Sequence, residues 1–378
     1  MRISDAELKI QRKKEFDERE QQLKNAKPQE LTQSFEEKER LHITYVMTWT
    51  GVCGGSKIIL EHANRLTERG HKITIISHDE KPTWYMLNDD VQFIEVPWTQ
   101  KLCKSIPTCD LIIVTYWREI YESIQQKIAP VIYFEQGDFH LFDINNVDER
   151  TYNYIRKQFE TVKFIYTVSS FARDKIKELY GHDSTVIPNA VDNTIFFKTE
   201  NERINAIPKV AIIGSENSEF KRIKNIIQAL QKLKKDGYDF EIKWITPDKP
   251  RELSIEAIVN PPQIIIGDTL RDSDIFVCAS IYESFCLPVL EAMTCGNAIV
   301  TTNNGGNMDF VVDGENALLV EKDNIEDIYN KVKKLLKDKE LRIRLSKNAE
   351  EKAGQYSWDN TISMIEKYYR SVASFRVI

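Results

Sequence analysis

Two carboxylates flank a predicted helix start in the second half of the chain, and the residue types around them suit phosphate chemistry. Glu283 and Glu291 stand eight positions apart in IYESFCLPVLEAMTCGNAIVTTNNGG, residues 281–306. Pro288 lies between them and suits the first turn of a helix, where its missing N–H costs nothing. A helix that begins there leaves several backbone N–H groups unpaired, and such groups bind anions. These groups belong to Phe285, Cys286, Leu287 and Val289.

A diphosphate at this helix start would bring hydroxyl groups within reach of both glutamates. Glu291, one turn inside the helix, can accept hydrogen bonds from a ribose, and Glu283, before the turn, can accept them from a sugar. A ligand with hydroxyls at both ends and phosphate in the middle is a nucleotide sugar. Two solvated glutamates beside a helix would show the same spacing, so the spacing alone leaves that alternative open.

A second candidate anion site lies at the start of the predicted helix 223–235, after a strand that ends at Gly214. Lys221, Arg222 and Lys224 stand there in the segment FKRIKNIIQAL. Cations at a helix N-terminus are locally unfavourable, so they bind an anion or point into water. Their position after the first strand of an α/β domain favours phosphate, and a solvated basic run remains the alternative.

A Gly-rich turn, TWTGVCGGSKII, follows the first predicted strand of the chain's first half. Gly54 and Gly55 would let the backbone approach a ligand closely, with exposed N–H groups directed at it. The turn is not GxGxxG, and no acidic residue closes the next strand as a dinucleotide ribose requires. An ordinary tight turn between strand and helix is an equal alternative.

The composition permits an enzyme and argues against several other classes of protein. The 378 residues are 42% hydrophobic and 29% charged, and the net charge of −6 argues against binding nucleic acid by broad phosphate neutralisation. The six cysteines include no CxxC pair, so we expect reduced thiols, no metal and no cofactor. No apolar run approaches the ~18 residues of a membrane span and no signal peptide begins the chain, which predicts a cytoplasmic protein.

Short apolar runs alternate with amphipathic segments from Leu41 onward, the pattern of a parallel sheet with crossover helices. Residues 41–195 form one predicted Rossmann-like domain, with helices at 152–160 and 170–180. Its predicted strands are HITYVMT, KITIISH, VQFIEVP, CDLIIVTYW, PVIYFEQG, KFIYTVS and STVIP. Residues 1–40, which are dense in charged and amide side chains, predict a polar helical or partly disordered arm.

A second alternation of the same kind predicts another Rossmann-like domain over residues 208–357, with helices at 223–235 and 288–295. Its predicted strands are KVAIIGS, FEIKWIT, QIIIGD, DIFVCAS, NAIVTTN and ALLVEK. The polar stretch 193–208 joins the domains and is predicted to act as a hinge for closure during catalysis. The predicted fold class is therefore α/β, with two doubly wound domains and ligands in the cleft between them.

In the order and spacing of these segments the chain resembles the retaining glycosyltransferases of family four, the group-1 glycosyltransferases with the GT-B fold. The resemblance runs from Leu41 to the C-terminus. It rests on GVCGGSKIILEHANRLTERGHKITIIS, YTVSSFARDKIKELYG, VIPNAVDNTIF, FKRIKNIIQAL, the Glu-x7-Glu segment and VVDGENALLV. It implies that the second domain binds a nucleotide sugar, that the first binds the acceptor, and that the last helix, in 358–378, crosses back to the first domain.

The resemblance also implies roles for individual residues. Lys221 would be the phosphate lysine and Glu283 would contact the donor sugar, both as catalytic residues, while Glu291 would bind the ribose. The other positions implied in donor binding are Gly214, Arg222, Phe285, Cys286 and Leu287. Those implied on the acceptor side of the cleft are Gly54, Gly55, Gln136 and His140.

Three positions depart from the family's pattern. Ser215 stands where the family usually has an arginine, so a neighbouring cation, Arg222 or Lys224, would have to supply the second positive charge. Gln136 stands where a histidine commonly ends the strand, with a histidine four residues on. Cys286 replaces the usual glycine after the aromatic residue of the Glu-x7-Glu turn. These changes affect the details of the mechanism rather than the fold.

Together these features predict a retaining glycosyltransferase of the hexosyltransferase type. We expect it to move a sugar from a nucleotide sugar, a UDP-sugar, to a glycan, lipid-linked or small-molecule acceptor without a metal. The resemblance implies cell-surface polysaccharide or glycoconjugate synthesis, with peripheral contact at the inner face of the membrane and no nucleic-acid partner. The leaving diphosphate would gain charge beside Lys221 and the helix N–H groups. An inactive partner of the same fold and a sugar-nucleotide epimerase are the alternatives.

Overall fold

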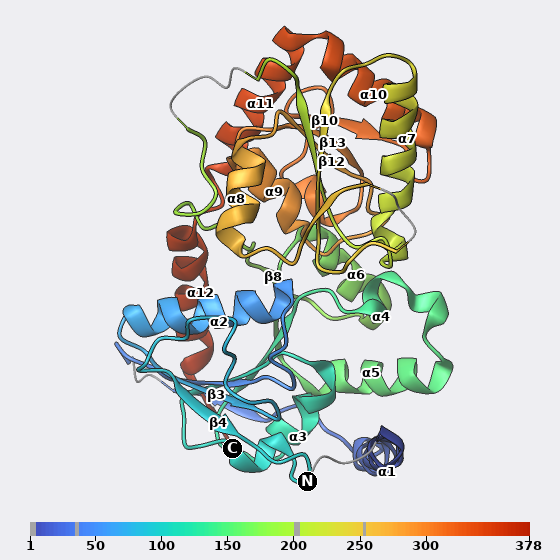
Figure 1. The fold of residues 1–378 in the computed structure, drawn as a ribbon. Coiled ribbons are helices and arrows are strands. Elements are labelled where there is room, and N and C mark those ends of the chain that lie inside the picture. Colours follow the sequence, from blue (N-terminus) through green and yellow to red (C-terminus); the bar gives the residue numbers. More distant parts are fainter. Residues whose placement is uncertain (1–4, 35–37, 200–204, 252–254) are drawn as a thin grey trace. The chain divides into compact units, whose positions relative to one another are not determined.

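Two structural units make up the chain, each with its own parallel sheet (Figure 1). A computed structural model describes residues 5–34, 38–199, 205–251 and 255–378, with side chains from residue 13 onward. The first unit comprises Met1–Val168, Arg173–Ile187 and Ile362–Ile378, and the second comprises Ser169–Ala172 and Pro188–Thr361. The α/β class with two Rossmann-like sheets is the one that the sequence predicts.

The sheet of the first unit has seven parallel strands in the order β4-β3-β2-β5-β6-β7-β8. They are β2 (His42–Val46), β3 (Lys72–Ser77), β4 (Gln92–Glu95), β5 (Leu111–Val114), β6 (Val131–Glu135), β7 (Phe164–Thr167) and β8 (Thr185–Val186). Every residue of β5 and β6 is buried, as expected for parallel strands covered on both faces. Each of the seven corresponds to a strand predicted from the sequence.

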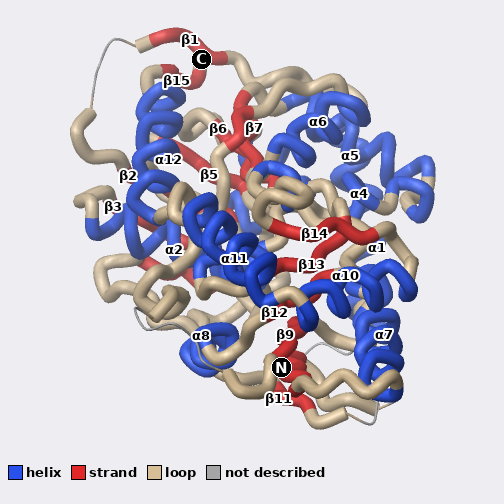
Figure 2. The backbone as a smooth tube through the Cα atoms, turned by 90° about the horizontal axis from the view of Figure 1, so that it is seen from above, coloured by secondary structure: helices blue, strands red, loops and turns tan. Residues whose placement is uncertain are grey.

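Six α-helices that follow β2 in the sequence contribute to the described part of the first unit, and the last of them returns to it from the second. They are α2 (Gly54–Glu68), α3 (Ile120–Ile124), α4 (Phe139–Phe142), α5 (Glu149–Thr161), α6 (Ser170–Tyr180) and α12 (Trp358–Ala373). In α12, the hydroxyl of buried Tyr369 lies 3.1 Å from that of Tyr45 in β2 and 2.8 Å from that of Tyr166 in β7. Arg69 at the end of α2 donates to Glu366 of α12 at 2.8 Å, and Figure 2 shows the two helices close together. The resemblance implied this return of the last helix, which the structure confirms.

The N-terminal segment is built into the first unit. Helix α1 (Asp5–Leu23) buries Arg19, whose guanidinium lies 3.4 Å from a carboxylate oxygen of Glu119 and 3.0 Å from one of Glu122. Buried Gln29 donates to the carbonyl of Ala129 at 3.0 Å. Arg19, one of the charged residues that favoured a solvated arm, thus has buried partners of opposite charge far along the chain.

Backbone pairing also fixes the part of this segment that follows α1. Strand β1 (Leu31–Gln33) pairs antiparallel with β15 (Phe375–Val377) in a separate two-stranded sheet. Helix α1 agrees with the predicted polar helix, but the structure corrects the interpretation of the described part of residues 1–40 as an extension, because α1 and β1 pack within the first unit. Residues 1–4 and 35–37 of the predicted arm lie outside the described residues.

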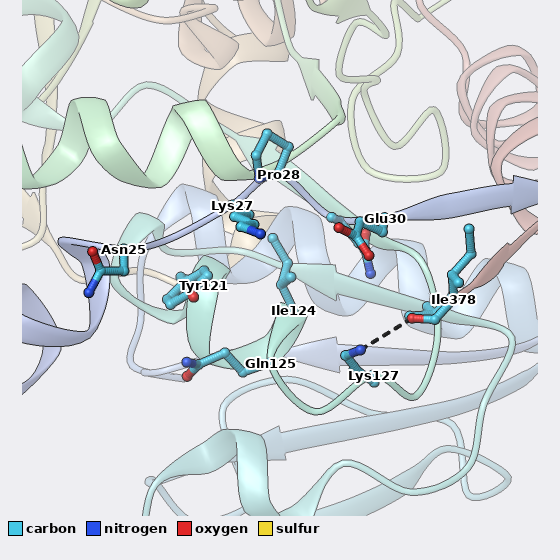
Figure 3. Close-up of a pocket in the computed structure, with 11 residues that line it drawn as sticks. Asn25, Lys27, Pro28, Glu30, Tyr121, Ile124, Gln125, Lys127 and Ile378 are labelled. Carbon is cyan, nitrogen blue, oxygen red and sulfur yellow. Dashed lines mark hydrogen bonds between the residues drawn. The ribbon is translucent and has the colours of Figure 1, made fainter.

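A hollow of about 240 Å³ lies where this segment approaches α3 and the last strand (Figure 3). Nζ of Lys127 donates to the backbone oxygen of Ile378 at 3.3 Å on one side of it. The residues that line it are Asn25, Lys27, Pro28, Gln29, Glu30, Tyr121, Ile124, Gln125, Lys127, Val377 and Ile378. None of these residues belongs to a site predicted from the sequence.

The second unit has a six-stranded parallel sheet in the order β11-β10-β9-β12-β13-β14. Its strands are β9 (Lys209–Ile213), β10 (Glu241–Thr246), β11 (Ala257–Val259), β12 (Ile275–Cys278), β13 (Ala298–Thr302) and β14 (Ala317–Val320). Its helices are α7 (Ile223–Lys235), α8 (Gln263–Arg271), α9 (Leu287–Thr294), α10 (Ile325–Lys337) and α11 (Lys339–Ala353). All residues of β12 and β13 are buried, so the centre of this sheet is also covered on both faces.

The segment QIIIGD is helical, and its prediction as a strand is wrong. It forms most of α8, which follows Pro262 at the N-cap. A short apolar run fits a strand or a helix equally well, and only flanking residues decide between them. Here Ile264 and Ile265 stay 48% and 39% exposed on the helix, and the edge strand is the preceding β11.

The unit boundaries differ in detail from the predicted domains. Residues 188–195, predicted in the first domain, belong to the second unit, as do the first residues of α6. Within the predicted hinge 193–208, residues 200–204 lie outside the described residues. Among the described residues, no helix is both long enough and apolar enough to cross a membrane.

Candidate functional site

The side chains of Lys221 and Glu283 meet in loops at the carboxyl end of the second unit's sheet. Lys221 ends a short 3₁₀ helix (Glu219–Lys221) after β9, and Glu283 follows β12. Lys221 Nζ lies 2.5 Å from Glu283 Oε1, and the hydroxyl of Ser280 donates to the same oxygen at 2.8 Å. Two residues that the sequence singles out for separate reasons are thereby brought together, where parallel α/β sheets bind ligands.

The position of Lys221 beside Glu283 favours the charged form of the lysine. Burial lowers the pKa of Lys221, but the adjacent carboxylate of Glu283 more than offsets it and leaves the pKa above its ordinary value. The lysine side chain remains 20% exposed and that of the glutamate 15%. The carboxylate therefore holds a positively charged ammonium in place while leaving part of it accessible to an anion.

Helix α9 begins beside this pair with an unusual N-cap. Cys286 caps it with a φ of 71°, a left-handed conformation that favours glycine. Among the hydrogen bonds of the described residues, none uses the N–H groups of Phe285, Cys286 or Leu287, whereas the N–H of Val289 donates to the Cys286 carbonyl at 3.1 Å. The structure therefore leaves three of the four predicted anion donors unused within the fold, and the prediction for Val289 is wrong.

Two thiols lie side by side next to this helix start. The sulfur atoms of Cys278 and Cys286 are 3.8 Å apart, and both residues are buried. The hydrogen bond with Cys278, together with burial, raises the pKa of Cys286 well above its ordinary value. All six cysteines are free thiols, and no group of three or more His, Cys, Asp or Glu side chains in the described ranges is arranged to hold a metal ion.

Gly306 lets the turn after β13 pack directly on the backbone around Glu283. The N–H of Glu283 donates to the carbonyl of Asn304 at 2.9 Å, and its own carbonyl accepts from the N–H of Gly306 at 3.0 Å. A Cβ atom at position 306 would lie 2.3 Å from the carbonyl carbon of Ser284. Because the clash is with backbone, no side chain fits there, and Gly306 helps to fix the position of the Glu283 loop.

We expect Gly306→Ala to displace the Glu283 loop and to lower turnover at least ~10-fold, with a loss of stability of ~1–3 kcal/mol typical of overpacking. Steady-state rates and the midpoint of thermal unfolding measure the two effects. Gly354→Ala in the same unit is the matched control, because its added Cβ would meet nothing closer than 3.4 Å. Equal rates for the two variants would show that this turn does not position Glu283.

The basic residue next to Lys221 points elsewhere. Nε of Arg222 lies 2.5 Å from Asp323 Oδ1, and its NH1 group donates to the carbonyl of Glu219 at 2.7 Å. At the position where the family usually has an arginine, the hydroxyl of Ser215 donates to Asp248 at 2.7 Å. The structure thus places Lys221 against Glu283, whereas Arg222, the predicted second cation, pairs with Asp323.

Gly214, predicted near the donor, has a clear role in packing. Its φ is 151°, and a Cβ atom there would lie 2.9 Å from Cδ1 of Ile223 in α7. The indole N–H of Trp244 donates to its carbonyl at 2.9 Å. The glycine therefore lets the end of β9 approach α7 closely, which sets the course of the loop that carries Lys221.

In the first unit, Gly54 and Gly55 are the first residues of α2 rather than a turn before it. The sulfur of Cys53 caps this helix by accepting from a backbone N–H at 3.3 Å. Nε2 of Gln136 donates to the carbonyl of Gly55 at 3.2 Å, so the structure joins two of the residues predicted on the acceptor side. Both glycines adopt helical geometry, so their placement in a turn is wrong, whereas the close approach of a ligand to them stays a prediction.

His140 is fully buried, and the prediction that it faces the acceptor is wrong. Its Nε2 lies 3.2 Å from Glu135 Oε2 and its Nδ1 lies 2.9 Å from the hydroxyl of Tyr180. The histidine is buried because it completes a polar network at the end of β6. Gln136, in the loop that this network supports, keeps partial exposure.

Glu135 is the member of this network that the sequence reasoning missed. It is buried, and its Oε1 accepts the N–H of Gly137 at 2.6 Å and that of Asp138 at 3.1 Å. Burial raises the pKa of this carboxyl, but the hydrogen bond and charge of His140 more than offset it and leave the pKa below its ordinary value. The sequence did contain a signal for Glu135. In VIYFEQG this carboxylate ends an apolar strand, two residues before a glycine.

Comparison with known proteins finds a family match in the second unit. Residues 260–352 match the family described as Glycosyl transferases group 1, and this segment contains Glu283, Glu291 and the start of α9. This match agrees with the resemblance seen in the sequence. Lys221 and the first unit lie outside the matched segment.

Two curated relatives show how far the similarity extends along this chain. An uncharacterized glycosyltransferase, MJ1178, from Methanocaldococcus jannaschii is 31% identical over 108 residues, 29% of this chain and 31% of the relative. The N-acetyl-alpha-D-glucosaminyl L-malate synthase of Bacillus anthracis is 24% identical over 361 residues, 84% of this chain and 94% of the relative. The chain thus aligns with about a third of the first relative's length and with nearly all of the second.

Solved structures show that this chain shares its fold with other proteins over most of its length. Anabaena Alr3699/HepE in complex with UDP-glucose superposes with a TM-score of 0.72 at 16% identity, covering 88% of this chain and 100% of the other. At that identity the likeness establishes the fold, and it agrees with the GT-B class that the sequence predicts.

Proposed function

We propose that the protein is a retaining glycosyltransferase that takes a hexose from a nucleotide-sugar donor, a UDP-sugar, and passes it to a carbohydrate, lipid-linked or small-molecule acceptor. The observation that carries the proposal is the Lys221–Glu283 pair, 2.5 Å apart, beside the start of α9. Support comes from the match of residues 260–352 to the group 1 glycosyl transferases, from a relative named for a glucosaminyl malate, and from a similar structure that holds UDP-glucose.

The donor diphosphate is proposed to lie between the ammonium of Lys221 and the unused N–H groups at the start of α9. Charge develops on this diphosphate as the glycosidic bond breaks, and a fixed ammonium and fixed N–H dipoles stabilise it there. Glu283 is proposed to contact the sugar and Glu291 the ribose. Since Glu283 shares one oxygen between Lys221 and Ser280, donor binding is expected to rearrange these hydrogen bonds.

Retention is proposed to follow from attack by the acceptor on the face from which the diphosphate leaves. The proton of the acceptor hydroxyl would then pass to a leaving phosphate oxygen, so that no side chain has to act as general base. Buried His140 fits this scheme because it is engaged by Glu135 and Tyr180. The proposed place of the reaction is polysaccharide or glycoconjugate synthesis, without a metal cofactor.

Release of free UDP from a panel of UDP-hexoses, with and without acceptor, tests this function. We expect release that rises when cell-derived glycans or lipid extracts are added, that persists in EDTA, and that gives a product whose anomeric proton has the configuration of the donor by NMR. Conversion of the donor to its epimer without UDP release would indicate an epimerase instead. Binding of UDP without turnover of any UDP-hexose would indicate an inactive partner.

A further inference from the structure

Half of the chain's six tryptophans are exposed, and the exposed ones lie in neighbouring loops. Trp49, Trp84 and Trp98 have exposed fractions of 53%, 37% and 36%, whereas Trp117, Trp244 and Trp358 are at most 7% exposed. The exposed three follow β2, β3 and β4, which are adjacent in the sheet order β4-β3-β2. Three large aromatic side chains are therefore left in water at one stretch of the carboxyl edge of the first unit's sheet, an arrangement typical of a binding surface.

The three rings are held in place rather than loosely exposed. The indole N–H of Trp84 donates to the carbonyl of Thr50 at 2.9 Å, which ties the loop after β3 to the loop after β2. The ring of Trp98 stacks on His78 with centroids 4.4 Å apart and planes 21° apart. Fixed rings lose little conformational freedom when a ligand covers them, so they favour binding.

Gly51 determines where the third ring lies. A Cβ atom at this position would be 2.2 Å from Cζ2 of Trp49, so the indole rests directly on the glycine backbone. Within the segment TWTGVCGG, Gly51 is thus the glycine at which another group comes too close for a side chain to fit. That group is the indole ring of Trp49.

Carboxylates stand beside these aromatic faces. Asp79 follows β3 and accepts the N–H of Thr50 at 2.9 Å, and exposed Glu80 is its neighbour. The carbonyl of Glu80 accepts the hydroxyl of Thr50 at 3.2 Å, so both acidic residues are anchored to the loop that bears Trp49. The surface therefore combines apolar ring faces with negatively charged hydrogen-bond acceptors.

We propose that the tryptophan surface formed by Trp49, Trp84 and Trp98 binds a neutral sugar ring, and that this ring belongs to the acceptor. The assignment of this ring to the acceptor rests on the proposed function. A pyranose has an apolar C–H face that packs on an aromatic ring and a rim of hydroxyls that donates to carboxylates, and it matches both features of the surface. A phosphorylated ligand would be repelled by Asp79 and Glu80, and an acyl chain would leave those carboxylates desolvated without partners. The acceptor is therefore a glycan or glycoside whose sugar is recognised directly.

Binding of methyl glycosides to the whole chain tests this proposal independently of catalysis. The probes are the methyl α- and β-glycosides of glucose, galactose, mannose and N-acetylglucosamine, followed by tryptophan fluorescence and by ligand-observed NMR. We expect at least one to bind saturably, and we expect Trp84→Ala and Trp49→Ala each to weaken it ~3- to 10-fold, the range of one aromatic contact. Trp84→Phe, which keeps a ring but loses the bond to Thr50, should give an intermediate affinity.

Ile343→Ala provides a control for the loss of an exposed apolar side chain, because Ile343 is 51% exposed on α11 of the other unit. It should bind the glycosides as the parent protein does. Thermal unfolding midpoints within a degree or two of the parent are expected for Trp49→Ala and Ile343→Ala, whose side chains are about half exposed, and lower midpoints for the two Trp84 variants, which lose the hydrogen bond to Thr50.

The outcomes separate this proposal from the proposed function. Absence of glycoside binding, or equal binding by Trp49→Ala, Trp84→Ala and the parent, would overturn the proposal even if UDP is released to another acceptor. Co-sedimentation with phosphatidylcholine–phosphatidylglycerol vesicles that is lost in Trp84→Ala would identify a membrane as the occupant and would also overturn it. Glycoside binding that depends on the tryptophans, in a chain that never turns over a UDP-hexose, would support the sugar surface and remove the acceptor assignment.

Discussion

Replacement of Lys221 by alanine should lower turnover at least ~100-fold, the effect of removing one group that stabilises developing negative charge. Lys221 is the cation that the structure holds beside the start of α9, with Nζ 2.5 Å from Glu283. The adjacent cation, Arg222, is engaged with Asp323 instead. UDP release measured at saturating donor and acceptor gives the turnover.

Controls for Lys221→Ala must distinguish lost catalysis from lost folding, because the change leaves the carboxylate of Glu283 without its ammonium. The double variant Lys221→Met, Glu283→Gln removes both charges and should recover thermal stability without recovering turnover. Lys232→Ala in α7 removes an exposed lysine that pairs with Glu326 at 2.5 Å, and should keep the parent rate. Near-full activity of Lys221→Ala would mean that this lysine is structural and that the donor binds elsewhere.

Arg19→Ala should destabilise the first unit by ~3–5 kcal/mol, the cost of removing one partner of a buried ion pair and leaving the other charge buried without it. Its guanidinium is 6% exposed and lies among the carboxylates of Glu119 and Glu122, which are 3% and 4% exposed. Burial lowers the pKa of Arg19, but the two carboxylates more than offset it and leave the pKa above its ordinary value. Without this charge the glutamates keep Lys101, which pairs with Glu122, and the weaker influence of Arg118 on Glu119.

Urea unfolding, followed by circular dichroism and by the fluorescence of the first unit's tryptophans, measures this effect. Arg150→Ala is the matched control, because Arg150 also pairs with two carboxylates, Asp17 and Glu20 of α1, yet its side chain is 46% exposed. This variant should unfold close to the parent, since exposed pairs contribute little. Equal unfolding of Arg19→Ala and Arg150→Ala would show that the buried cluster does not anchor α1.

Amphipathic spacing predicted the bounds of some helices well. The predicted helices 170–180 and 223–235 coincide with α6 and α7. In α7 the apolar positions recur on one face and are buried, while the lysines between them stay partly or fully exposed, so the 3.6-residue period is unambiguous. The segment QIIIGD lacks such a period, and its prediction as a strand was wrong.

The site was predictable as a set of residues and less so as a geometry. The turn around Glu283, the helix start at Leu287 and the lysine at 221 all follow from local sequence. The contact between Lys221 and Glu283 joins residues 62 positions apart, and no local rule gives it. Burial of Arg19 and His140 could not be predicted either, since their partners also lie elsewhere in the sequence. Without those partners a charged or titratable side chain is expected to be solvated.

Pairing of β1 with β15 has a consequence for the order in which the chain folds during synthesis. Gln33 pairs with Phe375, roughly 340 positions later, and the whole second unit is synthesised between them. The second unit is almost continuous in sequence and can complete its sheet as it leaves the ribosome. The first unit begins earlier in the sequence, but its fold is incomplete until α12 has been synthesised. The hydroxyls of Tyr45 and Tyr166 have their hydrogen-bond partner in Tyr369 of that helix. We therefore expect the half that is translated first to become protease-resistant last.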